Sequence, residues 1–144
     1  MLRRSSLPLV LAVATLAFYA TPTQGRPGDL DASFGSGGRV LAPSVGGGGG
    51  FGADGRDLVR TRDGGFALTA NAYGIDSTTV LLARYRADGS IDRSFATAGV
   101  AVVADSFGLG GSLIEQPDGK LVVAAASPGR RLMLVRFNAD GTLD

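Results

Sequence analysis

The apolar positions after residue 25 fall in short runs that are separated by Gly, Asp and Pro. The runs are rich in Val, Leu and Ala, and none carries the period and end signals of an amphipathic helix. They therefore predict short β-strands and an all-β fold. The expected strands are Arg39–Ala42, Asp57–Arg60, Phe66–Ala70, Thr79–Tyr85, Val100–Ala104, Ser112–Gln116, Lys120–Ala126 and Arg131–Phe137.

One short motif recurs three times along the chain, as Gly28-Asp-Leu-Asp31, Asp88-Gly-Ser-Ile-Asp92 and Asp140-Gly-Thr-Leu-Asp144. Corresponding residues are 61 apart at Phe34 and Phe95, 55 apart at the next Asp-Gly turn, and 52 apart at Tyr85 and Phe137. Length changes confined to loops are typical of a repeated structural unit. We therefore divide the chain after the first 25 residues into two repeats, 26–92 with a Gly-rich insert at 46–55, and 93–144.

Two of the expected strands are apolar at successive positions, around Val80–Ala83 and Leu121–Ala126. Such strands must be covered on both faces, as happens when sheets stack on one another. A repeat of this length with four short strands suits a β-propeller blade better than a β-helix coil or a two-sheet sandwich. Propellers close with about 4 to 8 blades, so two blades form an incomplete propeller. We expect a piece of a longer repeat protein, with assembly of several copies as the alternative.

The first 25 residues have the pattern of a secretory signal peptide. Arg3 and Arg4 precede the apolar stretch Leu7–Tyr19, and small and polar residues follow it. The stretch is shorter than the roughly 20 residues that span a membrane as a helix. We expect a signal helix with an undefined cleavage point, export to the periplasm, the cell surface or the medium, and no membrane association after cleavage.

Composition narrows the possible chemistry. The 144 residues include 23 Gly but no Cys, His or Trp. Disulfides, Cys/His zinc sites and imidazole-based triads are therefore excluded. The 14 basic and 13 acidic residues form no basic stripe, which argues against a nucleic-acid partner.

Three blocks carry a resemblance to a known family. They are Gly28-Asp-Leu-Asp-Ala-Ser-Phe-Gly-Ser-Gly-Gly38, Gln116-Pro-Asp-Gly-Lys120 and Arg136-Phe-Asn-Ala-Asp-Gly-Thr-Leu-Asp144. On these blocks the chain resembles the bacterial delta-60 repeat family. The resemblance implies β-propeller repeats of uncharacterised function in exported and surface proteins, with no catalytic or ligand residues to transfer. The first repeat departs from the pattern at Arg62-Asp-Gly-Gly65, and the second has Ala96 where the family prefers Gly.

The recurring charged residues have a structural and a functional interpretation. The Asp-Gly motifs lack the oxygen ligands of an EF-hand loop, because Arg84 and Arg136 occupy ligand positions. These arginines could form a cationic rim, or they could pair with a repeated Asp such as Asp92 or Asp144. Recurrence favours the pairs, because repeated positions generally serve the repeated unit.

No catalytic, metal-binding or cofactor-binding residue is assigned, since nothing in the sequence brings the non-repeated carboxylates Asp105 and Glu115 together. The recurring aromatic residues are expected core anchors. The structural repeat positions are Gly28, Leu30, Asp31, Phe34, Gly38, Asp63, Gly64, Arg84, Tyr85, Asp88, Gly89, Asp92, Phe95, Gly99, Asp118, Gly119, Arg136, Phe137, Asp140, Gly141 and Asp144.

These observations favour an exported, non-catalytic propeller module with a binding or scaffold role. Its partner would be an unknown protein or glycan ligand. Two alternatives remain open. One is part of an extracellular propeller enzyme that acts on carbohydrate, and the other is a structural module that self-assembles through its open blade faces.

Overall fold

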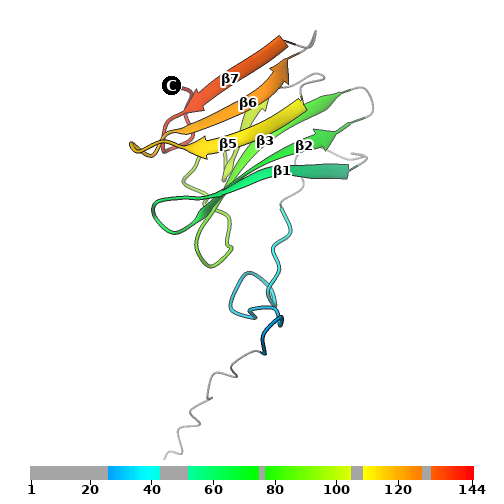
Figure 1. The fold of residues 1–144 in the computed structure, drawn as a ribbon, viewed down its shortest axis with the longest axis vertical. Coiled ribbons are helices and arrows are strands. Elements are labelled where there is room, and N and C mark those ends of the chain that lie inside the picture. The colour runs from blue at the N-terminus through cyan, green and yellow to red at the C-terminus, as the bar shows by residue number, and fades with distance from the viewer. Residues whose placement is uncertain (1–25, 43–51, 75–76, 105–108, 128–130) are drawn as a thin grey trace, which may run out of the picture.

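The chain folds as two antiparallel sheets. The computed structural model describes residues 26–42, 52–74, 77–104, 109–127 and 131–144, and none of these residues lies in a helix (Figure 1). The predicted signal helix and the Gly46–Gly50 run lie outside the described residues. Among the residues described there is also no helix long and apolar enough to cross a membrane.

The first sheet has four strands in the order β1-β2-β3-β4. They are β1 (Gly52–Arg60), β2 (Phe66–Tyr73), β3 (Thr78–Tyr85) and β4 (Val100–Ala104). The second sheet has three described strands in the order β5-β6-β7. They are β5 (Leu109–Glu115), β6 (Leu121–Ser127) and β7 (Arg131–Phe137). The tight turns at Thr61–Gly65 and Gln116–Lys120 connect the first two strands of each sheet and are closed by backbone hydrogen bonds.

The sheets do not coincide with the sequence repeats. β4, which the sequence places at the start of the second repeat, pairs with β3 of the first sheet, with Leu82 opposite Ala101. The chain thus leaves β3, passes through the loop that carries Phe95, and returns to the same sheet. The boundary at residues 92 and 93 is therefore a repeat boundary but not a sheet boundary. The expectation that the four strands of a repeat form one blade was wrong for the second repeat, because its first strand joins the first sheet.

The expected strand Arg39–Ala42 was also wrong. Arg39 makes an isolated parallel bridge to Gly35, and residues 40–42 have no regular secondary structure. Its repeat counterpart is β4, which forms because β3 lies beside it. No described strand lies beside residues 39–42 in this way, so their backbone has no ladder to join.

Part of the Gly-rich insert at 46–55 lies in a strand. Residues 52–55 belong to β1, where Gly52 pairs with Tyr73 and Gly55 with Ala70. They extend β1 because β2 runs on to Tyr73 and presents backbone groups that need partners. The pairing of β1 with β2 shifts register between Gly55 and Asp57.

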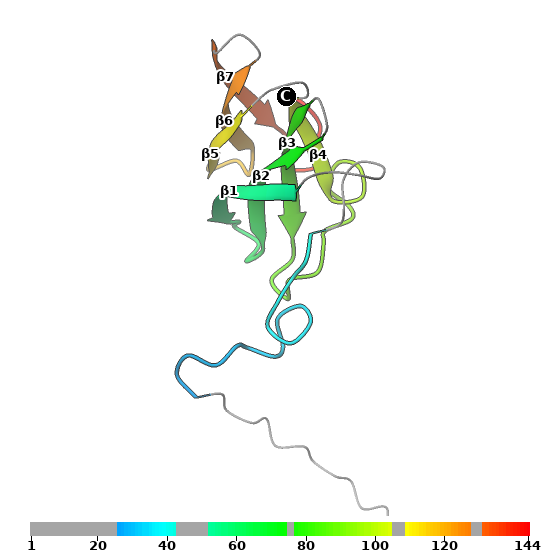
Figure 2. The same cartoon turned by 90° about the vertical axis from the view of Figure 1, so that its right-hand side faces the viewer.

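The core lies between the two sheets, which form two layers in Figure 2. Each sheet contributes apolar side chains, and the loop before β4 contributes Phe95, which is 1% exposed. The cluster comprises Ala67, Leu82, Phe95, Ala101, Leu113, Leu121, Val123 and Phe137, with Val59, Val103 and Val135 packed against it.

Polar contacts fix how one sheet sits on the other. The Ala96 N–H donates to the Asp140 carbonyl at 2.7 Å, which ties the Phe95 loop to the turn after β7. The Arg62 N–H donates to Glu115 and the Leu113 N–H to Asp57, both across the two sheets. The buried Asn71 accepts from the Gly110 N–H at 2.7 Å.

We predict that Phe95→Ala lowers the free energy of unfolding by about 3–5 kcal/mol, since it empties the centre of the core. Phe34→Ala is the matched control, because Phe34 is the repeat counterpart of Phe95 but only half-buried. Urea denaturation measures both effects. A loss for Phe95→Ala no greater than for Phe34→Ala would contradict its role as core anchor.

We predict that Ala98→Gly stabilises the fold by about 0.5–1 kcal/mol. Ala98 has a φ of 53°, a backbone conformation that costs a residue with a side chain about 1–2 kcal/mol. Glycine adopts this conformation without that cost, and the extra backbone entropy that it loses on folding is smaller than the strain removed. Ala87→Gly, in an exposed turn without a positive φ, should destabilise by about 0.4–1 kcal/mol. Thermal unfolding of the two variants tests the opposite signs.

Candidate functional site

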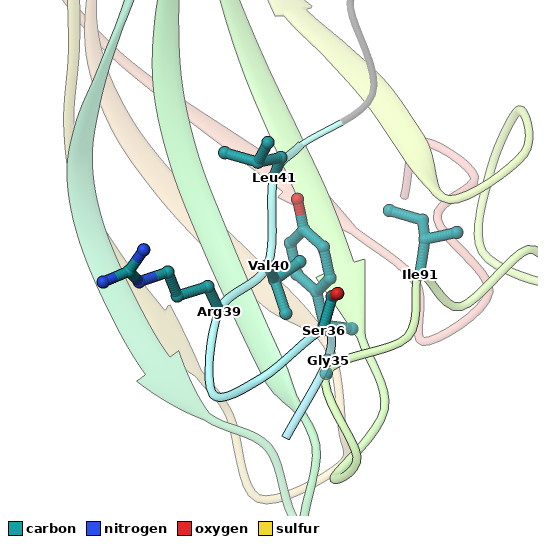
Figure 3. Close-up of a pocket in the computed structure, with 8 residues that line it drawn as sticks. Gly35, Ser36, Arg39, Val40, Leu41 and Ile91 are labelled. Carbon is teal, nitrogen blue, oxygen red and sulfur yellow. The ribbon is translucent and has the colours of Figure 1, made fainter. Parts of the chain in front are cut away.

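The face of the first sheet that points away from the second sheet is hollowed by two adjoining cavities. The larger has a volume of about 320 Å³ and lies beneath the segment 35–41. Its lining residues are Gly35, Ser36, Arg39, Val40, Leu41, Tyr85, Gly89 and Ile91. In Figure 3 the Arg39 side chain extends away from Val40 and Leu41, which leaves an apolar interior.

The second cavity, of about 220 Å³, lies further along the same face. It shares Val40 and Tyr85 with the first, and both cavities are open to solvent. Its lining residues are Phe34, Val40, Ala42, Leu58, Phe66, Leu68 and Tyr85. We call these seven residues the acceptor surface.

Local contacts hold the 34–40 loop over the sheet. The Phe34 ring meets the Phe66 ring edge-on, with centroids 5.9 Å apart. The Gly35 N–H donates to the Asp88 carbonyl at 2.7 Å, and the Ser36 N–H to the Arg39 carbonyl at 2.8 Å. A Cβ at Gly89 would come within 2.7 Å of Val40, so this position requires glycine for the loop to approach.

The acceptor surface can bind apolar groups but holds no acid–base pair. Its only side-chain polar atom is the Tyr85 hydroxyl, and burial raises the pKa of that phenol above its ordinary value of 10.0. Neither cavity is lined by a carboxylate. The phenol therefore stays protonated at neutral pH and can contribute a hydrogen bond at an otherwise apolar site.

The recurring arginines lie at strand ends and are engaged within the fold. Arg84 forms ion pairs with Asp63 at 2.7 Å and Asp92 at 3.6 Å, donates to the Ala139 carbonyl at 2.5 Å, and lies over the Phe95 ring. In the second repeat, the Arg136 Nε donates to Asp144 at 2.6 Å. This arrangement is the Arg–Asp pairing that recurrence favoured over a cationic rim.

The recurring aspartates close local turns. Asp88 accepts from the Ser90 N–H and hydroxyl, Asp140 does the same with Thr142, and Asp92 with Ser94. These hydrogen bonds hold the pKa of each carboxyl below its ordinary value of 3.8. Asp31 makes the same turn with Ser33. Asp118 accepts from the Lys120 N–H.

The recurring glycines all sit at turns with a positive φ. A Cβ at Gly141 would come within 2.6 Å of the Ala96 nitrogen, so glycine is required where this turn meets the Phe95 loop. Seven of the repeat positions share the positive φ, namely Gly28, Gly38, Gly64, Gly89, Gly99, Gly119 and Gly141. Leu30 at the first motif is instead largely exposed.

The residues that form the cavities were not singled out from the sequence, apart from Phe34, Tyr85 and Gly89. Their repeat counterparts could have identified them. Leu58 and Phe66 correspond to Leu113 and Leu121, which are core residues of the second repeat. The ion pair between Lys120 and Asp144 was also missed, because Lys120 has no basic counterpart in the first repeat. Within the described residues, no group of three or more Asp or Glu could hold a metal ion.

We predict that stability falls on acidification. Asp92 and Asp140 have a lowered pKa in the folded chain. The stabilisation that each contributes is therefore present above the unfolded pKa of about 3.8 and is lost as the pH falls through the lower folded pKa. Urea unfolding at a series of pH values from neutral into the acid range measures this loss. Ser94→Ala should reduce the loss of unfolding free energy at acid pH, because it removes the hydroxyl that bonds to Asp92. Ser112→Ala, on the exposed face of β5, should leave the pH dependence unchanged.

The comparisons with known proteins agree with this architecture. The family described as a domain of unknown function (DUF5122) beta-propeller matches residues 72–95 and 116–144, which include β3, β6, β7 and two of the three motifs. No curated protein and no solved structure matches the chain. The described residues therefore form antiparallel sheets of a β-propeller type.

Proposed function

We propose that the chain is an exported, non-catalytic β-propeller repeat module of the delta-60 type, with a binding or scaffold role at the bacterial surface or outside the cell. The observation that carries the proposal is the acceptor surface. Seven apolar or aromatic residues line a cavity on an open sheet face, and no carboxylate is among them. Such a surface fits a binding role better than a hydrolytic one.

The charged residues support the same conclusion. The repeated Arg and Asp side chains pair with one another or close turns. Glu115, one of the two carboxylates considered for a carbohydrate-active site, accepts a hydrogen bond from the Arg62 backbone and so joins the sheets. The other, Asp105, lies outside the described residues. The proposal of export is based on the charged and apolar pattern of residues 1–25.

We predict that the full chain, produced in a Gram-negative host, is recovered outside the cytoplasm with its N-terminus between residues 18 and 26. Arg3→Glu combined with Arg4→Glu should retain it in the cytoplasm, because the n-region loses its positive charge. Fractionation and mass spectrometry of the N-terminus report the result. An unprocessed cytoplasmic chain would contradict export.

The exported chain also tests the absence of catalysis. Incubated with a panel of oligosaccharides, it should release no products, and Glu115→Gln should behave like the parent chain. Products that disappear in Glu115→Gln would overturn the non-catalytic assignment and favour the carbohydrate-active alternative.

A further inference from the structure

The acceptor surface is one half of a core whose complete form exists elsewhere in the same chain. Every one of its seven residues has a repeat counterpart that belongs to the core between the sheets or packs against it. In order, Phe34, Val40, Ala42, Leu58, Phe66, Leu68 and Tyr85 correspond to Phe95, Ala101, Val103, Leu113, Leu121, Val123 and Phe137. The cavity thus marks the place where a further sheet would pack.

The other half of that core is exposed at the opposite end of the molecule. On the first sheet, Val80 and Leu82 are 0% exposed because they face the second sheet, whereas their counterparts Leu132 and Leu134 are 83% and 69% exposed. The counterpart of the half-buried Val59 is Ile114, which is 56% exposed. We call Ile114, Val122, Leu132 and Leu134 the donor face. Scattered exposed apolar residues are ordinary, but a contiguous set on one sheet face indicates an interaction surface.

The strand edges match in the same way. β3 is covered along its edge by β4, with Leu81 opposite Val102 and Leu82 opposite Ala101. The counterpart of β3 is β7, whose partner among the described strands is β6 alone. The counterpart of β4 is the segment 39–42, which has no ladder partner among the described strands. Equivalent pairing would set Leu134 opposite Val40 and Met133 opposite Leu41.

We propose that copies of this chain associate head to tail, with the donor face and β7 edge of one copy seated on the acceptor surface and segment 39–42 of the next. The contact reproduces between two chains the sheet-to-sheet core that each chain holds internally. The proposal goes beyond the binding or scaffold role and does not depend on export or on a further ligand.

The contact between copies would be more apolar than the internal one. Thr69 and Asn71, which bond to Gly111 and Gly110 across the internal core, have Ala124 and Ala126 as counterparts. One polar contact carries over: Arg84 donates to the Ala139 carbonyl, so Arg136 would reach the Ala87 carbonyl of the next copy.

One motif must move aside when the copies join. Residues 28–31 of the receiving copy and 141–144 of the donor both correspond to residues 89–92 of the internal junction. Asp144 is held by ion pairs with Arg136 and Lys120, whereas the Asp31 side chain bonds to Ser33 two residues away in an exposed loop. We therefore expect residues 28–31 of the receiving copy to be displaced when the copies associate.

The two surfaces differ, so the contact is heterologous and each copy keeps one donor face and one acceptor surface. Such contacts form a ring if the rotation closes and a filament if it does not. With two sheets per copy and about 4 to 8 blades in a closed propeller, a ring would contain about two to four copies.

Cysteine cross-linking tests the register, and the chain has no cysteine of its own. Val40→Cys and Leu134→Cys variants of the full chain are mixed and oxidised, and the linked peptides are identified by mass spectrometry. Directly opposed strand residues lie within disulfide range, so a Val40–Leu134 link between two chains is expected.

The control pairs Leu41→Cys with Leu134→Cys. Leu41 is 94% exposed and Val40 is half-buried, so non-specific collisions would link position 41 more readily than position 40. In the proposed strand pairing, neighbouring residues point to opposite faces, so position 41 should link less readily to position 134 than position 40 does. Linking at position 40 that does not exceed linking at position 41, or a Val40–Leu134 link within a single chain, would overturn the proposal.

Complementation tests the polarity of the contact. Leu134→Glu on the donor face and Leu58→Glu on the acceptor surface should each sediment as single chains, because both residues are exposed and a charge there blocks only the contact. Mixed together they should form a dimer, since each retains the surface that the other has lost. Thr97→Glu, exposed outside both surfaces, should keep the assembly of the parent chain. A monomeric parent chain, or a mixture that stays monomeric, would overturn the proposal.

Discussion

The structure depends on the burial of one aromatic ring between two sheets. Phe95 comes from a loop that belongs to neither sheet, yet it contacts the core formed by both. Its neighbour Ala96 bonds to the turn after β7, and the chain then returns to the first sheet as β4. A single loop thus sets the distance between the sheets, fills the space between them and supplies the edge strand. The same loop in the first repeat, with Phe34 in place of Phe95, lies over an open face and leaves a cavity.

Much of this fold could be predicted from local sequence signals. Seven of the eight expected strands are present, because Asp-Gly turns and short apolar runs act through nearest neighbours. The Arg–Asp pairs were predicted from their recurrence, and the residues that form the second pair and the Asp88 turn also lie close together in sequence. Arg136 and Asp144 lie eight residues apart, and Asp88 and Ser90 two apart.

What could not be predicted depends on contacts between distant parts of the chain. The run 39–42 is as β-prone as 100–104, but only the second has β3 beside it. Strand propensity alone cannot say which sheet a run joins, because edge pairing is decided by what lies next to it in space. The extension of β1 into the Gly-rich insert is similar, since β2 rather than the composition of the insert determines it. The cavities could not be predicted for the same reason. Leu58 and Phe66 have the sequence pattern of core residues, but no described sheet faces them.

The offset of one strand between repeat and sheet has a consequence for how such a chain can lengthen. A duplicated sequence repeat brings a loop that fills the last open core, a strand that completes the preceding sheet, and three strands that begin the next. Each added repeat therefore covers one exposed strand edge and one exposed sheet face, and it exposes a new edge and a new face of the same kind. Growth by duplication leaves the chemistry of both ends unchanged, so the number of repeats can vary without any new interface having to evolve.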